Sequence, residues 1–125
     1  MSKNKVILIE DDLDLAEIYR LKMSLENIEA IVVSDPTKAI ESLNEEIPDL
    51  ILLDIMMPEI NGFELFEQIK QEDKLKNIPI YIWSNLAQKK DKERADKIKV
   101  DGYLVKSEYT PADLAKKVKE LINKK

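Results

Sequence analysis

The fold of this chain is decided by the stretch Pro48-Asp49-Leu50-Ile51-Leu52-Leu53-Asp54-Ile55-Met56-Met57-Pro58. Its apolar residues run unbroken from Leu50 to Leu53 between the two prolines, which predicts a central strand of a parallel sheet, covered on both faces. Asp54 follows at the carboxyl end of this strand. Because ligands bind at that edge of open α/β sheets, Asp54 is a candidate functional residue, although a plain loop aspartate explains this residue alone equally well.

Strands and helices alternate on both sides of this stretch. Short apolar runs that end in polar or turn residues predict five strands, and apolar residues at helical spacing predict five helices. The strands are expected at residues 6–9, 28–33, 50–53, 78–83 and 102–105. The helices are expected at about 14–26, 36–47, 63–71, 88–98 and 111–122. The alternation implies βαβ units and therefore an α/β fold, a single doubly wound (βα)5 domain over residues 1–125 with a parallel five-stranded sheet.

The first helix is predicted from apolar residues at near-helical spacing, and its N-cap is expected at Asp12 or Asp14. The apolar residues that indicate it are Leu13, Ala16, Ile18, Leu21 and Leu25. For Asp12, a role as helix-capping acid is preferred over a role in chemistry.

Composition excludes several classes of function. The chain has 125 residues and a net charge of −5 without a long basic stripe, which disfavours binding to nucleic acid or to an anionic membrane. It contains no cysteine and no histidine, so thiolate and imidazole ligands are both excluded. The apolar run near the N-terminus is too short for a signal peptide or a membrane span, so a cytoplasmic location is the default expectation.

Polar side chains follow four of the predicted strands. Glu10 and Asp11 follow the first strand, Asp54 the third, Ser84 the fourth and Lys106 the fifth. Parallel strands end on the same side, so these groups converge if the strand order is 2-1-3-4-5. Two like charges about 4 Å apart repel by on the order of 4 kcal/mol at an effective dielectric of about 20, so the acids need a cation. Oxygen ligands alone favour Mg²⁺, and a carboxylate nucleophile with a lysine and a hydroxyl makes a phosphoryl-transfer site.

With these residues in place, the chain resembles the receiver domain of two-component response regulators, most closely the stand-alone chemotaxis type, which has a flavodoxin-like fold. The resemblance covers nearly the whole chain. It is carried by the acidic pair Glu10-Asp11, the region from Asp54 to Pro58 with Gly62, the hydroxyl of Ser84, the aromatic Tyr103 and Lys106. Each piece alone is weak, but all of them in order on the predicted strand ends make a specific pattern.

The resemblance implies a phosphoacceptor signalling domain, not an enzyme, in which Asp54 takes a phosphoryl group from a histidine kinase or histidine phosphotransfer protein. It implies that Asp11 and Asp54 ligate Mg²⁺ directly, that Glu10 acts through water, and that the Met56 carbonyl completes the protein ligands. Lys106 would pair with Asp54 and then with the phosphoryl group.

The resemblance also implies a switch. Ser84 would bind a phosphoryl oxygen and Tyr103 would turn inward behind it, remodelling the surface of helix four, strand five and helix five, where an unknown protein target would bind. Each residue also has a plainer interpretation. Tyr103 can be an ordinary strand aromatic, Ser84 an ordinary strand-end hydroxyl and Lys106 a solvated surface charge.

The chain departs from the family pattern at several positions. Ser107 follows Lys106 where the family usually has a proline in a cis bond, and cis before serine costs about 3–4 kcal/mol. Asn85 stands where a small residue is usual and is expected to narrow access to the site. Met56 and Leu86 are apolar at two positions that modulate hydrolysis in the family, so slow self-dephosphorylation is expected.

Two other classes of function are weighed against the receiver. A phosphohydrolase with an aspartate nucleophile, of the haloacid-dehalogenase type, needs a second acid two residues after Asp54, where this chain has Met56. A receiver-like interaction module that is never phosphorylated would not need the acids, Ser84 and Lys106 together. A P-loop enzyme is excluded, because neither Gly62 nor Gly102 lies in a phosphate-binding loop.

Overall fold

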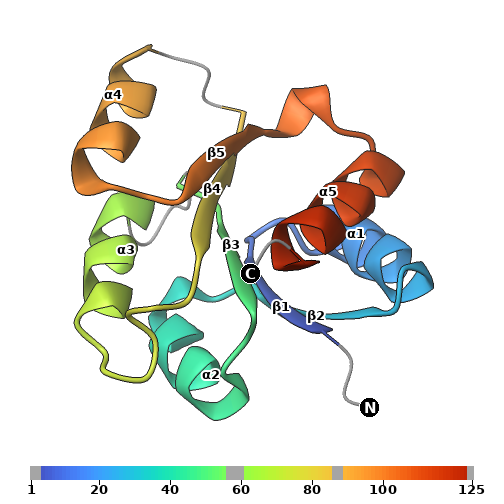
Figure 1. The fold of residues 1–125 in the computed structure, drawn as a ribbon, viewed down its shortest axis with the longest axis horizontal. Helices are drawn as coiled ribbons and strands as arrows, with labels where there is room; N and C mark the ends of the chain where they lie inside the picture. The colour runs from blue at the N-terminus through green and yellow to red at the C-terminus, as the bar shows by residue number, and fades with distance from the viewer. Residues whose placement is uncertain (1–3, 56–60, 86–88, 124–125) are drawn as a thin grey trace.

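The computed structural model describes residues 4–55, 61–85 and 89–123, without the side chains at 89–92 and 94. Figure 1 shows a central sheet with helices on both faces. Its strands are β1 (Asn4–Ile9), β2 (Ile28–Val33), β3 (Leu50–Leu53), β4 (Ile80–Ser84) and β5 (Gly102–Val105). They are parallel and lie in the order β2-β1-β3-β4-β5, which confirms the predicted topology.

Five α-helices connect and follow the strands in the described ranges. They are α1 (Leu13–Leu25), α2 (Ala39–Glu46), α3 (Gly62–Lys70), α4 (Lys89–Ile98) and α5 (Pro111–Asn123). Short 3-10 turns, η1 (Pro36–Lys38) and η2 (Lys106–Glu108), precede α2 and α5. None of the helices in the described ranges has the length and apolar character needed to cross a bilayer.

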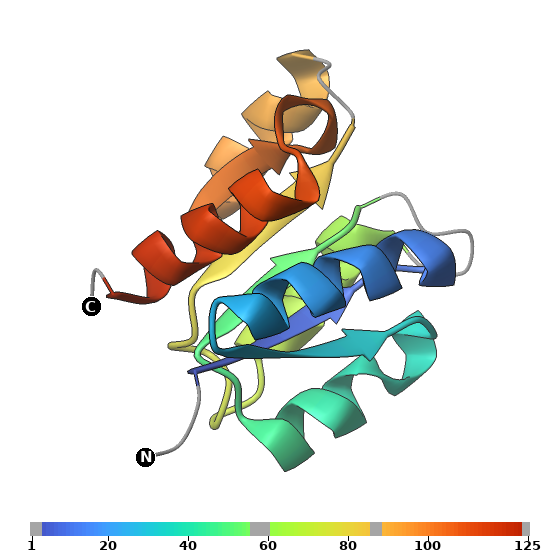
Figure 2. The same cartoon turned by 90° about the vertical axis from the view of Figure 1, so that its right-hand side faces the viewer.

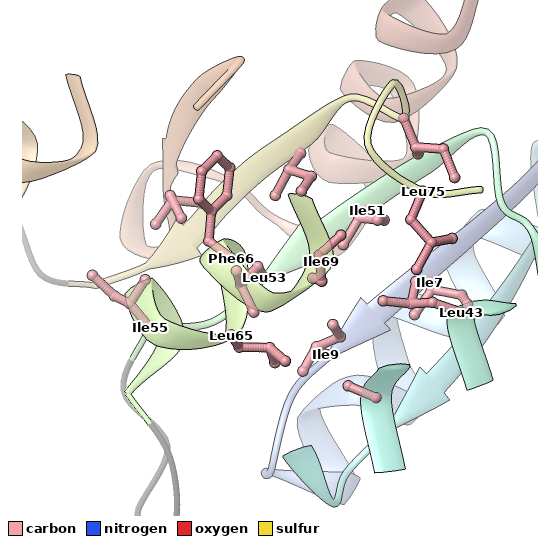
Figure 3. Close-up of a cluster of buried hydrophobic side chains, with 14 of the residues drawn as sticks. Ile7, Ile9, Leu43, Ile51, Leu53, Ile55, Leu65, Phe66, Ile69 and Leu75 are labelled. Carbon is pink, nitrogen blue, oxygen red and sulfur yellow. The ribbon is translucent and has the colours of Figure 1, made fainter. Parts of the chain in front are cut away.

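The sheet separates two apolar layers. On one face, α2, α3 and α4 pack on alternate strand residues such as Ile9, Leu53 and Ile82, and Figure 3 shows part of this cluster. On the other face, α1 and α5 pack on the intervening residues, among them Leu52 and Trp83. Figure 2 shows α1 and α5 lying over this second face. Because β3 is buried on both faces, its four residues must all be apolar, as the sequence pattern indicates.

The N-terminal half of β4 differs from the prediction. The strand was expected over 78–83 and instead runs from Ile80 to Ser84. Pro79 has no N–H to donate to a neighbouring strand, although its carbonyl accepts from Ile51 at 3.0 Å. The ladder therefore begins after the proline, and it continues to Ser84, which pairs with Val105 of β5.

Helix α1 begins as predicted but turns a different face to the core. The Asp12 side chain accepts a hydrogen bond from the Leu15 N–H at 3.1 Å and caps the helix. The buried residues of α1 are Ala16, Tyr19 and Met23. Of the apolar residues that indicated this helix, only Ala16 is buried; the other four are 47% to 76% exposed, namely Leu13, Ile18, Leu21 and Leu25.

Candidate functional site

Strand register places the two central carboxylates side by side. Ile9 of β1 pairs with Leu53 of β3, so Glu10 and Asp54, which directly follow these residues, are also neighbours. The Asp54 N–H donates to the Ile9 carbonyl at 3.1 Å, and the Glu10 N–H donates to the Val33 carbonyl at 3.0 Å. Glu10 is 1% and Asp54 4% exposed. Both acids are therefore held at the carboxyl edge of the sheet by main-chain hydrogen bonds.

Lys106 joins these two carboxylates. It directly follows Val105, the last residue of β5. Its Nζ donates to Glu10 Oε1 at 2.7 Å and to Asp54 Oδ2 at 3.0 Å. The lysine side chain is 12% exposed, so a nearly buried ammonium lies between two buried acids. Removing one partner from such a cluster leaves an uncompensated buried charge, so the three groups depend on one another.

A pocket of about 370 Å³ opens over this cluster. The residues that line it are Glu10, Asp11, Asp12, Leu15, Asp54, Ser84, Asn85 and Lys106. Glu10, Asp54 and Ser84 are buried, whereas Asp11 and Asn85 are exposed. The buried residues form the floor of the pocket, and the exposed residues form its outer part.

The donor set of the pocket fits a hard divalent cation. Glu10, Asp11 and Asp54 each offer a carboxylate oxygen, and these atoms lie within 4.8 Å of one another. The Glu10 Oε2 atom is buried and has no hydrogen-bond partner among the described residues. A buried carboxylate oxygen without a partner is costly, and a cation or its water would satisfy it.

The cluster perturbs the ionisation of its members. Burial, then the neighbouring Asp54 carboxylate, raises the pKa of Glu10 from 4.5 to about 8, although the Lys106 ammonium acts in the opposite direction. Burial by itself lowers the pKa of Lys106. Its hydrogen bond to Glu10 and the charge of Asp54 more than offset this, so the net pKa of Lys106 is raised. The lysine is thus held as a cation at neutral pH.

The other predicted site residues are placed as follows. Ser84 reaches the pocket, whereas Tyr103 packs against the cluster under α3 and α4 and is not among the lining residues. Met56, Pro58 and Leu86 lie outside the described residues. The Lys106–Ser107 peptide bond is trans, and η2 begins at Lys106.

Gly62 was quoted from the sequence as part of the family pattern, and the structure also gives it a packing role. A Cβ at this position would lie 2.4 Å from the Ile55 Cα and 2.8 Å from the Asp54 carbonyl oxygen. A glycine is therefore needed for the N-terminus of α3 to approach the segment that carries Asp54.

Sequence reasoning missed the contribution of α1 to the pocket. Leu15, in the first turn of α1, lines the pocket and was given no role, and Asp12 lines it as well as capping the helix. A signal was available, because a cap at Asp12 places the first turn of α1 immediately after the acidic pair Glu10-Asp11. The first turn of a helix that follows a strand end lies close to that edge of the sheet.

The fold is a doubly wound α/β domain. At the carboxyl ends of its strands, a cluster of carboxylates has the composition and spacing of a divalent-cation site. The chain belongs to the response regulator receiver domain family, whose model matches residues 6–119. Members of this family are signalling domains of two-component systems and not classical enzymes. They bind Mg²⁺ at an acidic pocket and interact with histidine kinases or phosphotransfer proteins.

Solved structures share this fold, and curated proteins are similar to the chain in sequence. Chemotaxis protein CheY4 of Vibrio cholerae superposes with a TM-score of 0.85 at 21% identity, covering 94% of this chain and 98% of that one. The Francisella response regulator 1452 receiver domain gives 0.83 at 27% identity, covering 97% and 98%. The phosphate regulon transcriptional regulatory protein PhoB of Escherichia coli is 25% identical over 120 residues, 96% of this chain and 52% of PhoB. The chain spans about half the length of the curated relatives it matches.

Proposed function

We propose that this chain acts in the cytoplasm as the phosphoacceptor of a two-component phosphorelay. Residues 1–125 act as one receiver domain, and Asp54 accepts a phosphoryl group from a histidine kinase or a histidine phosphotransfer protein. The observation that carries this proposal is the cluster in which Lys106 Nζ lies 3.0 Å from Asp54 and 2.7 Å from Glu10 at the floor of an open pocket.

In the reaction, an Asp54 oxygen attacks the phosphorus, and the bond from phosphorus to the donor's imidazole nitrogen breaks. The product is an aspartyl phosphate on Asp54, and the electron pair of the broken bond stays on the imidazole. The Lys106 ammonium is placed to transfer its hydrogen bond from the Asp54 carboxylate to an oxygen of the phosphoryl group. Ser84 offers a hydroxyl donor from the neighbouring strand.

Mg²⁺ would supply positive charge that offsets the approach of an anionic phosphoryl group to a cluster of acids. Glu10, Asp11 and Asp54 would hold it, with the carbonyl of Met56 as a further ligand. The unpartnered Oε2 of Glu10 supports this assignment.

The proposed output is a shift between two packings of the α4–β5–α5 surface. Ser84 would move toward a phosphoryl oxygen. Tyr103, a residue of β5 that packs against the apolar cluster under α3 and α4, would then turn inward behind Ser84. A protein target that binds this surface in only one packing would then sense the phosphorylation of Asp54.

The exposed apolar face of α1 is an argument that the phosphodonor is a protein. Ile18, Leu21 and Leu25 are exposed on successive turns of a helix whose first turn lines the pocket. A contiguous exposed apolar stripe is typical of a protein-binding surface, and its continuity with the pocket favours a helix of the donor as its occupant. Leu21→Gln is expected to slow transfer from the donor protein without slowing phosphorylation by a small phosphodonor.

The deciding experiment is incubation with a small phosphodonor and Mg²⁺, read by intact mass. A stable gain of one phosphoryl group, absent in Asp54→Asn and after chelation of Mg²⁺, supports the receiver. Continuous turnover of the phosphodonor would favour a phosphohydrolase, and no change in mass would favour an interaction module that is never phosphorylated. Because Met56 and Leu86 are apolar and cannot orient water, we expect slow loss of the phosphoryl group.

Trp83 provides an independent optical readout. It is fully buried next to Ser84 and packs edge-to-face on Tyr19 at 5.3 Å and Tyr109 at 6.0 Å between ring centres. Tyr109 follows the turn that begins at Lys106. A phosphoryl mimic with Mg²⁺ should therefore change Trp83 fluorescence in the native protein and leave it unchanged in Asp54→Asn.

A further inference from the structure

Leu15 differs in chemical kind from the rest of the pocket. The other lining residues that the structure describes carry a carboxylate, an amide, a hydroxyl or an ammonium, whereas Leu15 has no polar side-chain atom. It comes from α1, while most of the others come from strand ends. An apolar side chain at a site for a charged group contributes no binding energy to that group, so its presence there calls for a different role.

The position of Leu15 is fixed from two sides. Its N–H is held by the Asp12 side chain at 3.1 Å, and the Ala16 N–H donates to the Asp12 carbonyl at 2.9 Å, so Asp12 fixes the backbone of α1 at the two N–H groups that flank the Leu15 Cα. The Leu15 side chain is half-buried and packs against the apolar cluster that contains Trp83. It therefore cannot swing away from the pocket without losing apolar contacts.

Leu15 also belongs to the outer part of the pocket. Glu10, Asp54 and Ser84 are buried at the floor, whereas Leu15 is only partly buried and lies with exposed residues at the solvent side. In the part of the chain that the structure describes, an entrance by which water would reach a group on Asp54 lies on this side. Leu15 occupies part of that entrance with a side chain that can neither hold a water molecule nor accept its proton.

We propose that Leu15 is a positioning residue that slows hydrolysis of the aspartyl phosphate by excluding ordered water from the pocket. This inference rests on the proposed phosphorylation of Asp54. In hydrolysis, a water oxygen bonds to phosphorus, the bond from phosphorus to the Asp54 oxygen breaks with its electron pair on the carboxylate, and the water proton passes to solvent. The Leu15 side chain offers no hydrogen-bond partner that could orient this water. The lifetime of the signal is thus set partly by α1.

The test compares the decay of the phosphorylated protein in Leu15→Ala, Leu15→Gln and Leu15→Met. Each protein is phosphorylated with a small phosphodonor and Mg²⁺, the donor is removed, and the phosphorylated fraction is followed by intact mass. The alanine leaves more room for water at the entrance, the glutamine adds a polar group that can orient water, and the methionine keeps an apolar side chain of similar size. The matched control is Leu13→Ala, two residues earlier on α1, at a side chain that is 61% exposed and outside the pocket lining.

Leu15→Gln is expected to shorten the phosphoryl half-life by about 3- to 10-fold, a small part of the ~10²–10⁴ that a well-placed acid–base group contributes. Leu15→Ala should act in the same direction, whereas Leu15→Met and Leu13→Ala should retain the native half-life. Equal half-lives in the native protein, Leu15→Ala and Leu15→Gln would overturn the role of Leu15 while leaving the proposed function intact. If the native protein takes up no phosphoryl group, the proposed function fails first, and this inference fails with it.

A purely structural role for Leu15 predicts a different result. In that case Leu15→Ala would lower the midpoint of urea unfolding and leave the half-life of the folded, phosphorylated protein unchanged. The two measurements, made on the same samples, therefore separate loss of packing from loss of water exclusion. A half-life that changes only in proportion to the unfolded fraction also contradicts the proposal.

Discussion

The raised pKa of Glu10 makes the stability of the metal-free protein depend on pH in a defined direction. A carboxyl group whose pKa is raised by folding binds its proton more tightly in the folded state. Its contribution to stability is therefore fully present below pH 4.5 and is lost as the pH rises through about 8. The protein in a chelator should unfold more easily at pH 8 than at pH 6, opposite to the behaviour of a carboxylate paired on the surface.

The size of this effect follows from the two pKa values. With a pKa of 4.5 in the unfolded chain and about 8 in the folded protein, linkage gives a loss of about 2 kcal/mol between about pH 6 and pH 8. Between pH 6 and pH 8, no histidine or cysteine contributes to the pH dependence, because the chain contains neither of these residues. A loss of this size is a large fraction of the stability of a small domain.

The assay is urea unfolding at several pH values between 6 and 8, followed by Trp83 fluorescence in the presence of EDTA. Glu10→Gln should remove the pH dependence, because an amide does not titrate. Glu17→Gln is the matched control, since Glu17 is an exposed acid whose pKa is lowered by its hydrogen bond to Arg20 and titrates below this pH range. The reasoning is refuted if native stability is flat between pH 6 and 8, or if the slope persists in Glu10→Gln.

Three further outcomes are expected. Gly62→Ala should lower the free energy of unfolding by about 1–3 kcal/mol, because its Cβ would lie 2.4 Å from the Ile55 Cα; a neutral result in urea unfolding would contradict the close approach. Met23→Ala should cost about 2–5 kcal/mol and Leu21→Gln under about 0.5 kcal/mol, and equal losses in the same assay would contradict the observed face of α1. Mg²⁺ at ten times its Kd should raise the stability by about 1.4 kcal/mol in thermal unfolding, but not in Asp11→Asn.

Strand positions could be predicted from this sequence better than helix orientation, and the reason is physical. A strand such as β3, buried on both faces, must be apolar at every position, so its pattern has one interpretation. Helix α1 carries apolar residues on two opposite faces, and spacing alone cannot tell which one meets the sheet. The core contact uses Ala16, Tyr19 and Met23, whereas the larger aliphatic residues point outward. Tertiary packing, and not local pattern, decided this choice.

The convergence of Glu10, Asp54 and Lys106 was predicted from strand ends alone, and strand parity explains why these side chains also point to the same side of the sheet. Successive side chains of a strand point to opposite faces of the sheet. The residues of β1 from Val6 to Ile9, all four residues of β3, and Tyr103 and Leu104 of β5 alternate between the two apolar clusters. Continuing this alternation past the strand ends directs Glu10, Asp54 and Lys106 toward the α1 and α5 side. This is why these three meet one another and the first turn of α1.

The same parity directs Ser84 and Tyr103 toward the α3 and α4 side of the sheet, although Ser84 still lines the pocket over the charged cluster. Ser84 continues the alternation on the side of Ile82, and Tyr103 packs against the cluster under α3 and α4. A ligand on Asp54 that engages both Lys106 and Ser84 would thus contact groups that belong to opposite layers of the fold. Because packed layers do not deform continuously, such a ligand favours a discrete rearrangement of one layer against the other. Under the proposed function, the coupling between phosphorylation of Asp54 and the α4–β5–α5 surface would therefore follow from where two neighbouring strand ends direct their side chains.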